Sequence, residues 1–168
     1  SGKTMPEIGR ELDAEYLLEG SFQKSGEEVR LIVQLIYARD DDHIWSKEYD
    51  RNWNDIFAVQ SEVAQAIAEE LEAVITPEEK QRIEKKPTRN MAAYNTFLKG
   101  SEIHKVGILE NNKDLRRQAQ ILYRKAIQLD STFADPYVQL GWSYSTINID
   151  SALYFANRAL HFDNMNPG

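Results

Sequence analysis

The chain has 168 residues, a formal net charge of −7 and no cysteine. The acidic balance disfavours sequence-independent nucleic-acid binding, which needs Lys and Arg side chains to neutralise phosphates. The lack of cysteine excludes thiolate catalysis, disulfides and cysteine-based zinc sites. No segment approaches the roughly 20 consecutive apolar residues that cross a bilayer, so we expect no membrane insertion. The lack of cysteine suits the cytoplasm and the periplasm equally; of the two we favour the cytoplasm.

Residues 1–75 predict an α+β module. A short amphipathic helix at Pro6–Leu12 has proline near its start, where the missing N–H costs little. Alternating apolar residues and turn residues then predict three strands that form an antiparallel meander. The expected strands are Tyr16–Gln23, Val29–Tyr37 and His43–Asp50.

A long helix and a charged linker should follow the sheet. Apolar residues recur every three or four positions from Ile56 to Val74, with Asn54 as the expected N-cap. Thr76 and Glu79 have the spacing of a capping box, which predicts a second, highly charged helix over Glu78–Lys86. We interpret residues 76–90 as a linker helix between two domains.

Residues 91–168 predict an all-α region of two helical pairs. Tyr123–Asp130 aligns with Ala156–Asp163, and this internal similarity favours a repeat. The first pair is divergent, with a connection from Val106 to Lys113 that is longer than a standard turn and with Gly100 at the crossing. The expected helices are Ala92–Lys105, Asp114–Leu129, Asp135–Thr146 and Asp150–Phe162.

The second pair contains a repeat signature. Tyr137, Leu140, Gly141 and Tyr144 follow the spacing of a tetratricopeptide (TPR) repeat, a helix–turn–helix unit. Such units stack on one another and present a groove to protein partners. Four residues on another face of the same helix are our candidate protein-binding site, and ordinary packing of Trp142 against the first pair is the alternative. These residues are Asp135, Val138, Trp142 and Ser145.

The first module resembles a bacterial family. Five segments follow the pattern of the TolB amino-terminal-like domain that precedes TPR arrays: Glu7–Leu12, Tyr16–Ser21, Val29–Ile36, His43–Arg51 and Asp55–Ala64. In that family the module occurs in signalling proteins with an adenylate or guanylate cyclase domain or a winged-helix DNA-binding domain. The resemblance implies no catalytic residues in this module.

The resemblance also implies a strand and a helix upstream of Ser1, and we expect the chain to be a fragment of a longer protein with further repeats. A missing strand would leave a sheet edge unpaired, and unpaired edges recruit other chains. The last helix exposes Leu153, Leu160 and Phe162 to the next repeat. We therefore expect a homo-oligomer through the sheet edge or the terminal helix.

No catalytic, metal or cofactor site is predicted. Ser1–Thr4 lacks the upstream glycine and strand of a phosphate-binding loop, and Asp40–Asp42 lacks the spacing of a calcium loop. His43, His104 and His161 are isolated in the sequence. We expect a non-catalytic regulatory module that binds protein or peptide partners, or the parent protein's own domains. The alternative is a scaffold or assembly factor of a periplasmic envelope complex.

Overall fold

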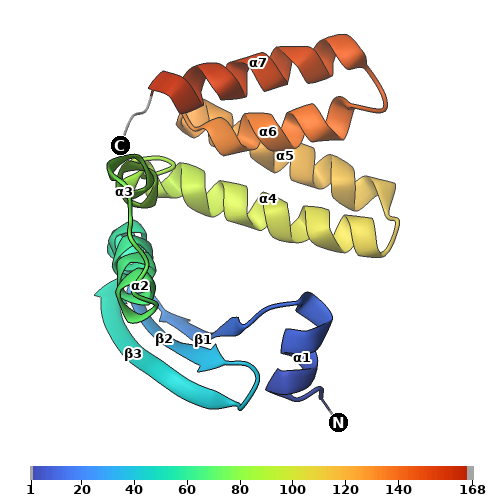
Figure 1. Ribbon diagram of the computed structural model, residues 1–168. Coiled ribbons are helices and arrows are strands. Elements are labelled where there is room, and N and C mark those ends of the chain that lie inside the picture. The colour runs from blue at the N-terminus through green and yellow to red at the C-terminus, as the bar shows by residue number, and fades with distance from the viewer. Residues whose placement is uncertain (1, 166–168) are drawn as a thin grey trace. The chain divides into compact units, whose positions relative to one another are not determined.

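The computed structural model describes residues 2–165, and it confirms an α+β fold followed by helices (Figure 1). The chain divides into two compact units, one that ends at Glu84 and one that begins at Lys85. Each unit is built from elements that are neighbours in sequence, so each can be described by itself.

The first unit contains the predicted meander. Helix α1 (Met5–Leu12) precedes β1 (Tyr16–Ser25), β2 (Glu28–Tyr37) and β3 (Asp42–Asn52), which pair antiparallel in the order β1-β2-β3. Gly26 makes the first turn with a φ of 61°, a left-handed conformation that glycine adopts without a steric penalty. The short turns explain why sequence neighbours are also sheet neighbours.

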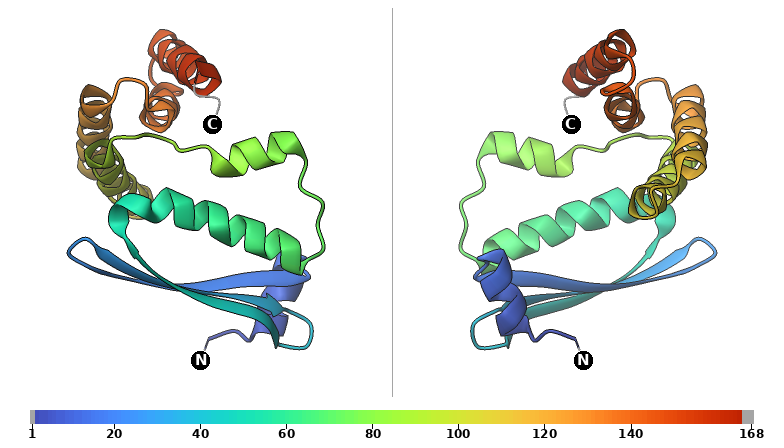
Figure 2. Two further views of the ribbon diagram at one scale, coloured as in Figure 1. Left: turned by 90° about the vertical axis from the view of Figure 1, so that its left-hand side faces the viewer. Right: turned by 90° about the vertical axis from the view of Figure 1, so that its right-hand side faces the viewer.

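Helix α2 (Ile56–Glu70) lies along one face of the sheet (Figure 2). The core between them consists of Val33, Tyr49 and Val59, with Trp45 packed at its margin. The predicted extension of α2 to Val74 is wrong. The chain leaves the helix because Glu72 takes a φ of 51° and the Ala73 N–H donates to the Ala68 carbonyl, which closes the helix end.

The start of α2 also differs from the prediction that Asn54 is its N-cap. A 3-10 turn, η1 (Trp53–Asp55), comes first, and the Asn52 side chain accepts a hydrogen bond from the Asn54 backbone N–H. Helix α3 (Pro77–Glu84) begins with the expected capping box of Thr76 and Glu79. Its end packs on α2, where the Ser61 hydroxyl donates to the Ile83 carbonyl at 2.8 Å.

The second unit consists of two helical hairpins (Figure 1): α4 (Met91–Leu109) with α5 (Lys113–Leu129), and α6 (Ala134–Tyr144) with α7 (Ile149–Met165). The connection between α4 and α5 is short, so the predicted long loop is wrong. Helix α4 continues to Leu109, and Gly107 in its last turns lets the backbone of Arg116 in α5 come close. A Cβ atom at position 107 would lie only 3.0 Å from the Arg116 backbone nitrogen.

Helix α6 covers the first hairpin. The Phe133 ring, just before α6, lies 5.1 Å from the Phe97 ring of α4 between centroids. Tyr137 and Leu140 continue this contact into a core that includes the fully buried Tyr123 of α5. Phe133, Tyr137 and Leu140 are spaced i, i+4 and i+7, so a single helical stripe holds α6 on the α4–α5 pair.

Candidate functional site

An apolar groove of about 430 Å³ opens between α6 and α7. No charged side chain contributes to its lining. Helix α6 supplies Val138, Gly141, Trp142 and Ser145, and helix α7 supplies Ala152, Leu153, Ala156, Ala159 and Leu160. The groove can therefore gain affinity from burial of apolar surface rather than from ion pairs.

Small residues make the groove hollow. Gly141 lies at the helix crossing, where a Cβ atom added to it would be 3.6 Å from the Ala152 carbonyl oxygen. Ala156 occupies the place on α7 that Tyr123 occupies on α5, because Gly100 and Gly141 face these two positions in their respective hairpins. The exchange of a tyrosine for an alanine removes a ring and leaves the space that the groove occupies.

Large apolar side chains form the rim. The exposed fraction is 72% for Trp142, 55% for Leu153 and 62% for Leu160. A contiguous exposed apolar surface of this kind marks an interaction site more often than it marks an ordinary face of a monomer. Tryptophan in particular is enriched among the residues that dominate binding energy at protein interfaces.

The equivalent face of the first hairpin is covered. Ala119, Tyr123 and Ala126 are 0% exposed, and Ala119 and Tyr123 belong to one cluster with Tyr137 and Leu140 of α6. At the matching positions of the second hairpin, Ala156 is exposed, whereas Ala152 and Ala159 are buried. Within the described residues of the second unit, no further helix lies on the α6–α7 face as α6 lies on α4–α5.

The structure brings three of the four predicted binding residues into this groove. Val138, Trp142 and Ser145 line it, whereas Asp135 is not among the lining residues. Burial raises the pKa of Asp135, the neighbouring Asp163 raises it further, and Lys85 acts in the opposite direction. Asp135 therefore belongs to a charged cluster at the start of α6, where Lys85 Nζ lies 2.7 Å from Asp163 Oδ1.

The α7 wall of the groove was missing from the predicted site. The signal was present in the sequence as an apolar stripe at i, i+4, i+7 and i+11, namely Ile149, Leu153, Ala156 and Leu160. All four side chains are exposed. A stripe of this spacing predicts one helical face, but only the packing of α7 on α6 decides whether that face points inward or outward.

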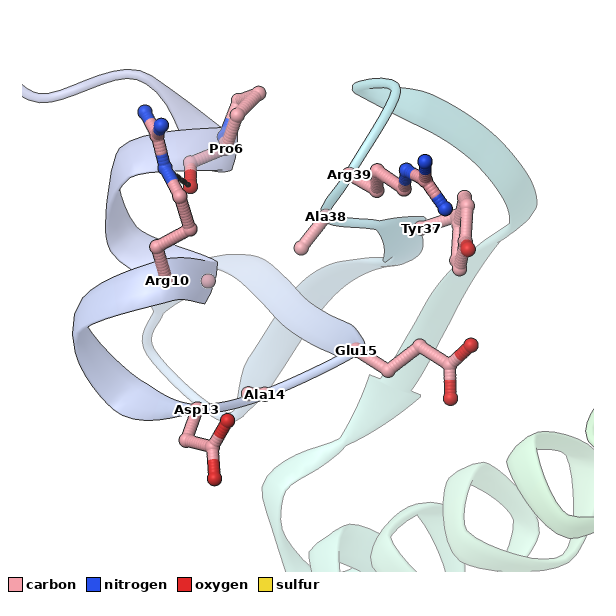
Figure 3. A pocket seen from close by; sticks show the side chains of 9 residues that line it. Pro6, Arg10, Asp13, Ala14, Glu15, Tyr37, Ala38 and Arg39 are labelled. Atoms are coloured by element: carbon pink, nitrogen blue, oxygen red, sulfur yellow. Dashed lines mark hydrogen bonds between the residues drawn. The ribbon is translucent and has the colours of Figure 1, made fainter.

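A second hollow lies in the first unit, between α1 and the ends of β1 and β2. Figure 3 shows that the charged ends of Arg10, Asp13 and Glu15 point away from one another rather than toward a common point. Arg10 Nε donates to the Pro6 carbonyl at 3.2 Å. Without converging polar groups this hollow is a weaker candidate than the α6–α7 groove.

Two histidines outside the groove have structural partners. His104 Nδ1 lies 3.1 Å from the Tyr123 hydroxyl, and His43 Nδ1 lies 2.6 Å from Gln34 Oε1. Among residues 2–165, no group of three or more His, Asp or Glu side chains is arranged to hold a metal ion. Over the same residues, we find no helix with the length and apolarity needed to span a membrane.

Comparison with known proteins gives one distant relationship. A protein named "Putative adenylate cyclase 3" from Rhizobium meliloti (strain 1021) is 28% identical over 179 aligned residues. The alignment covers 99% of this chain and 30% of the relative, so the chain spans less than a third of that protein's length. No family model matches the sequence. The chain is thus a distant homologue of a protein named for adenylate cyclase.

Proposed function

We propose that this chain is a non-catalytic regulatory and protein-interaction module of a cyclase-linked bacterial signalling protein. In this proposal a TolB amino-terminal-like module in the first unit precedes TPR repeats in the second. The name of the distant relative favours cyclase-linked signalling over an envelope scaffold. The repeat assignment draws on the motif around Gly141 and on the two hairpins that α4–α5 and α6–α7 form.

The observation that carries the binding role is the open apolar groove with Trp142 at its rim. Its uncharged lining suits an apolar ligand surface, and its length along two helices suits another helix. The first hairpin provides a template, because its equivalent face receives α6 through Phe133, Tyr137 and Leu140. The proposed ligand is therefore an amphipathic helix with one aromatic and aliphatic stripe.

A peptide with the sequence of residues 131–146 is the natural probe, because it carries the α6 stripe. The test is fluorescence anisotropy of the labelled peptide during titration with the whole chain. We expect saturable binding that Trp142→Ala weakens at least about tenfold, since truncation of a tryptophan that becomes buried in an interface costs about 2 kcal/mol or more.

Two controls make this test specific. Ile121→Ala removes an apolar side chain of 61% exposure on α5, outside the groove, and should leave peptide affinity unchanged. A peptide with Tyr137→Glu should not bind, because it would place an unpaired carboxylate on an apolar surface. Equal binding by the Trp142→Ala variant and the unaltered chain would refute the groove as the binding site.

A further inference from the structure

A polar and aromatic hollow of about 410 Å³ lies where the end of α6 and the start of α7 meet α5. Helix α5 supplies Arg124, helix α6 supplies Tyr144, and helix α7 supplies Asp150, Ser151, Tyr154 and Phe155. None of these residues lines the apolar groove. The Arg124–Asp150 hollow, named for its two charged residues, is therefore separate from the proposed helix-binding site.

Aromatic contacts hold the Arg124 guanidinium in place. Its Nη2 atom donates to the Tyr144 hydroxyl at 2.8 Å, and its Cζ atom lies 5.5 Å from the centroid of the Phe155 ring. These contacts restrict the side chain, but neither Tyr144 nor Phe155 supplies a carboxylate. A guanidinium has five N–H donors, so donors of Arg124 remain for a bound molecule.

The hollow contains one cation and one anion, and they do not pair. Among residues 2–165, the ion pairs of 4.0 Å or less include neither Arg124 nor Asp150. The positions three and four away from Arg124 on α5 hold only glutamine and isoleucine, and those around Asp150 hold no lysine or arginine. Neither residue therefore has an opposite charge on its own helix. Two opposite charges that line one hollow without pairing suit a molecule that carries both complementary charges.

We propose that the Arg124–Asp150 hollow binds a small zwitterion, a free α-amino acid with an aromatic side chain. Its carboxylate accepts hydrogen bonds from Arg124, and its ammonium donates to Asp150. Tyr154 is 58% exposed and meets the Phe155 ring edge-on at 5.2 Å between centroids, so its own ring is open to an aromatic side chain. The volume of the hollow lies within the range of about 300–1,000 Å³ that is typical of small-molecule sites.

The two charges favour a zwitterion over simpler ions. A simple anion would be attracted by Arg124 and repelled by Asp150, and a simple cation would meet the reverse. An amino acid satisfies both residues at once and adds burial of its ring. The proposed site goes beyond helix binding, and neither site depends on the other.

Isothermal titration calorimetry of the whole chain with three compounds tests the proposal. The probes are L-phenylalanine, N-acetyl-L-phenylalanine, which lacks the ammonium, and phenethylamine, which lacks the carboxylate. We expect saturable binding of L-phenylalanine with a dissociation constant of about 1 mM or lower, as suits a ligand of this size. Each analogue should bind at least about tenfold more weakly, because it leaves one charge of the hollow without a partner.

Two variants assign each charge to its partner. Arg124→Gln should weaken L-phenylalanine at least about tenfold and bring it level with phenethylamine, since the carboxylate no longer contributes. Asp150→Asn should likewise bring L-phenylalanine level with N-acetyl-L-phenylalanine. Lys125→Gln removes a neighbouring exposed charge of α5 outside the hollow and should leave all three affinities unchanged.

Circular dichroism of each variant shows whether its fold is intact, which is expected because Arg124 and Asp150 are exposed. The three-compound comparison on the unaltered chain decides the outcome if a variant does not fold. No saturable binding of L-phenylalanine up to about 20 mM would overturn the proposal, as would equal binding of the three compounds or full affinity in Arg124→Gln. Binding of the 131–146 peptide should be unchanged in Arg124→Gln, so failure at this hollow leaves the proposed function intact.

Discussion

Alanine at the two helix-crossing glycines should have different effects on stability. Gly141 in α6 and Gly100 in α4 occupy matching positions in their hairpins, but their surroundings differ. A Cβ at position 141 would lie 3.6 Å from both the Ala152 oxygen and the Ala156 nitrogen, which is ordinary van der Waals contact. A Cβ at position 100 would lie 3.0 Å from Cε1 of Tyr123 and 3.2 Å from Cβ of Leu122.

The magnitudes follow from two effects. Replacement of glycine by alanine in a helix interior stabilises the helix by about 1 kcal/mol at either position. At Gly141 no steric cost offsets this gain, so Gly141→Ala should raise the free energy of unfolding by about 1 kcal/mol. At Gly100 the fully buried Tyr123 ring would have to move, and overpacking of this kind costs about 1–3 kcal/mol. Gly100→Ala should therefore be neutral or destabilising by up to about 2 kcal/mol.

Urea unfolding followed by far-ultraviolet circular dichroism measures both variants. Because the helix-propensity gain is common to the two positions, the difference between them isolates the steric cost at Tyr123 and should be about 1–3 kcal/mol. In a thermal scan, 1 kcal/mol corresponds to about 4–8 °C in Tm for a domain of this size. Equal effects of Gly141→Ala and Gly100→Ala, or a loss of stability in Gly141→Ala, would refute the packing described here.

Two further predictions concern α6. Leu140→Ala should lower the free energy of unfolding by about 2–5 kcal/mol, because Leu140 is 0% exposed in the core. Val138→Ala at the groove rim should lower it by less than about 1 kcal/mol. Equal urea midpoints for the two variants would contradict this. Because burial raises the pKa of Asp135, the folded state holds its proton more tightly, and its contribution to stability is lost as pH rises through the folded pKa. Asp135→Asn should therefore stabilise the chain more at about pH 7 than near the ordinary aspartate pKa of about 3.9, and a pH-independent difference in urea midpoint would contradict the sign.

Local sequence patterns were sufficient to predict the sheet. Strict alternation over β2 and the short turns around Gly26 and Asp41 determine both the strands and their antiparallel order. The end of α2 was not predictable in this way, because the apolar stripe continues past Glu70 while a non-glycine residue, Glu72, adopts the left-handed conformation that closes the helix. A helix end without glycine or proline leaves little signal in the sequence.

The groove was predictable only in part. Helical spacing was enough to place Val138, Trp142 and Ser145 on a face distinct from the one that holds Tyr137 and Leu140. The hollow itself depends on the packing of α7 against α6 and on Ala156 at the position that matches Tyr123. The alignment of Tyr123 with Ala156 was visible in the sequence. Only the packing of the two hairpins shows that the missing tyrosine ring leaves the hollow of the groove.

Helix binding in the α6–α7 groove can be followed at Trp142 itself, in the indole N–H spectrum of the 15N-labelled chain during titration with unlabelled 131–146 peptide. The chain has three tryptophans, so Trp45 at the margin of the sheet core and the buried Trp53 serve as internal controls for Trp142 at the groove rim. We expect the Trp142 signal to shift saturably while the Trp45 and Trp53 signals stay in place. An unmoved Trp142 signal at excess peptide, or equal shifts of all three signals, would contradict it.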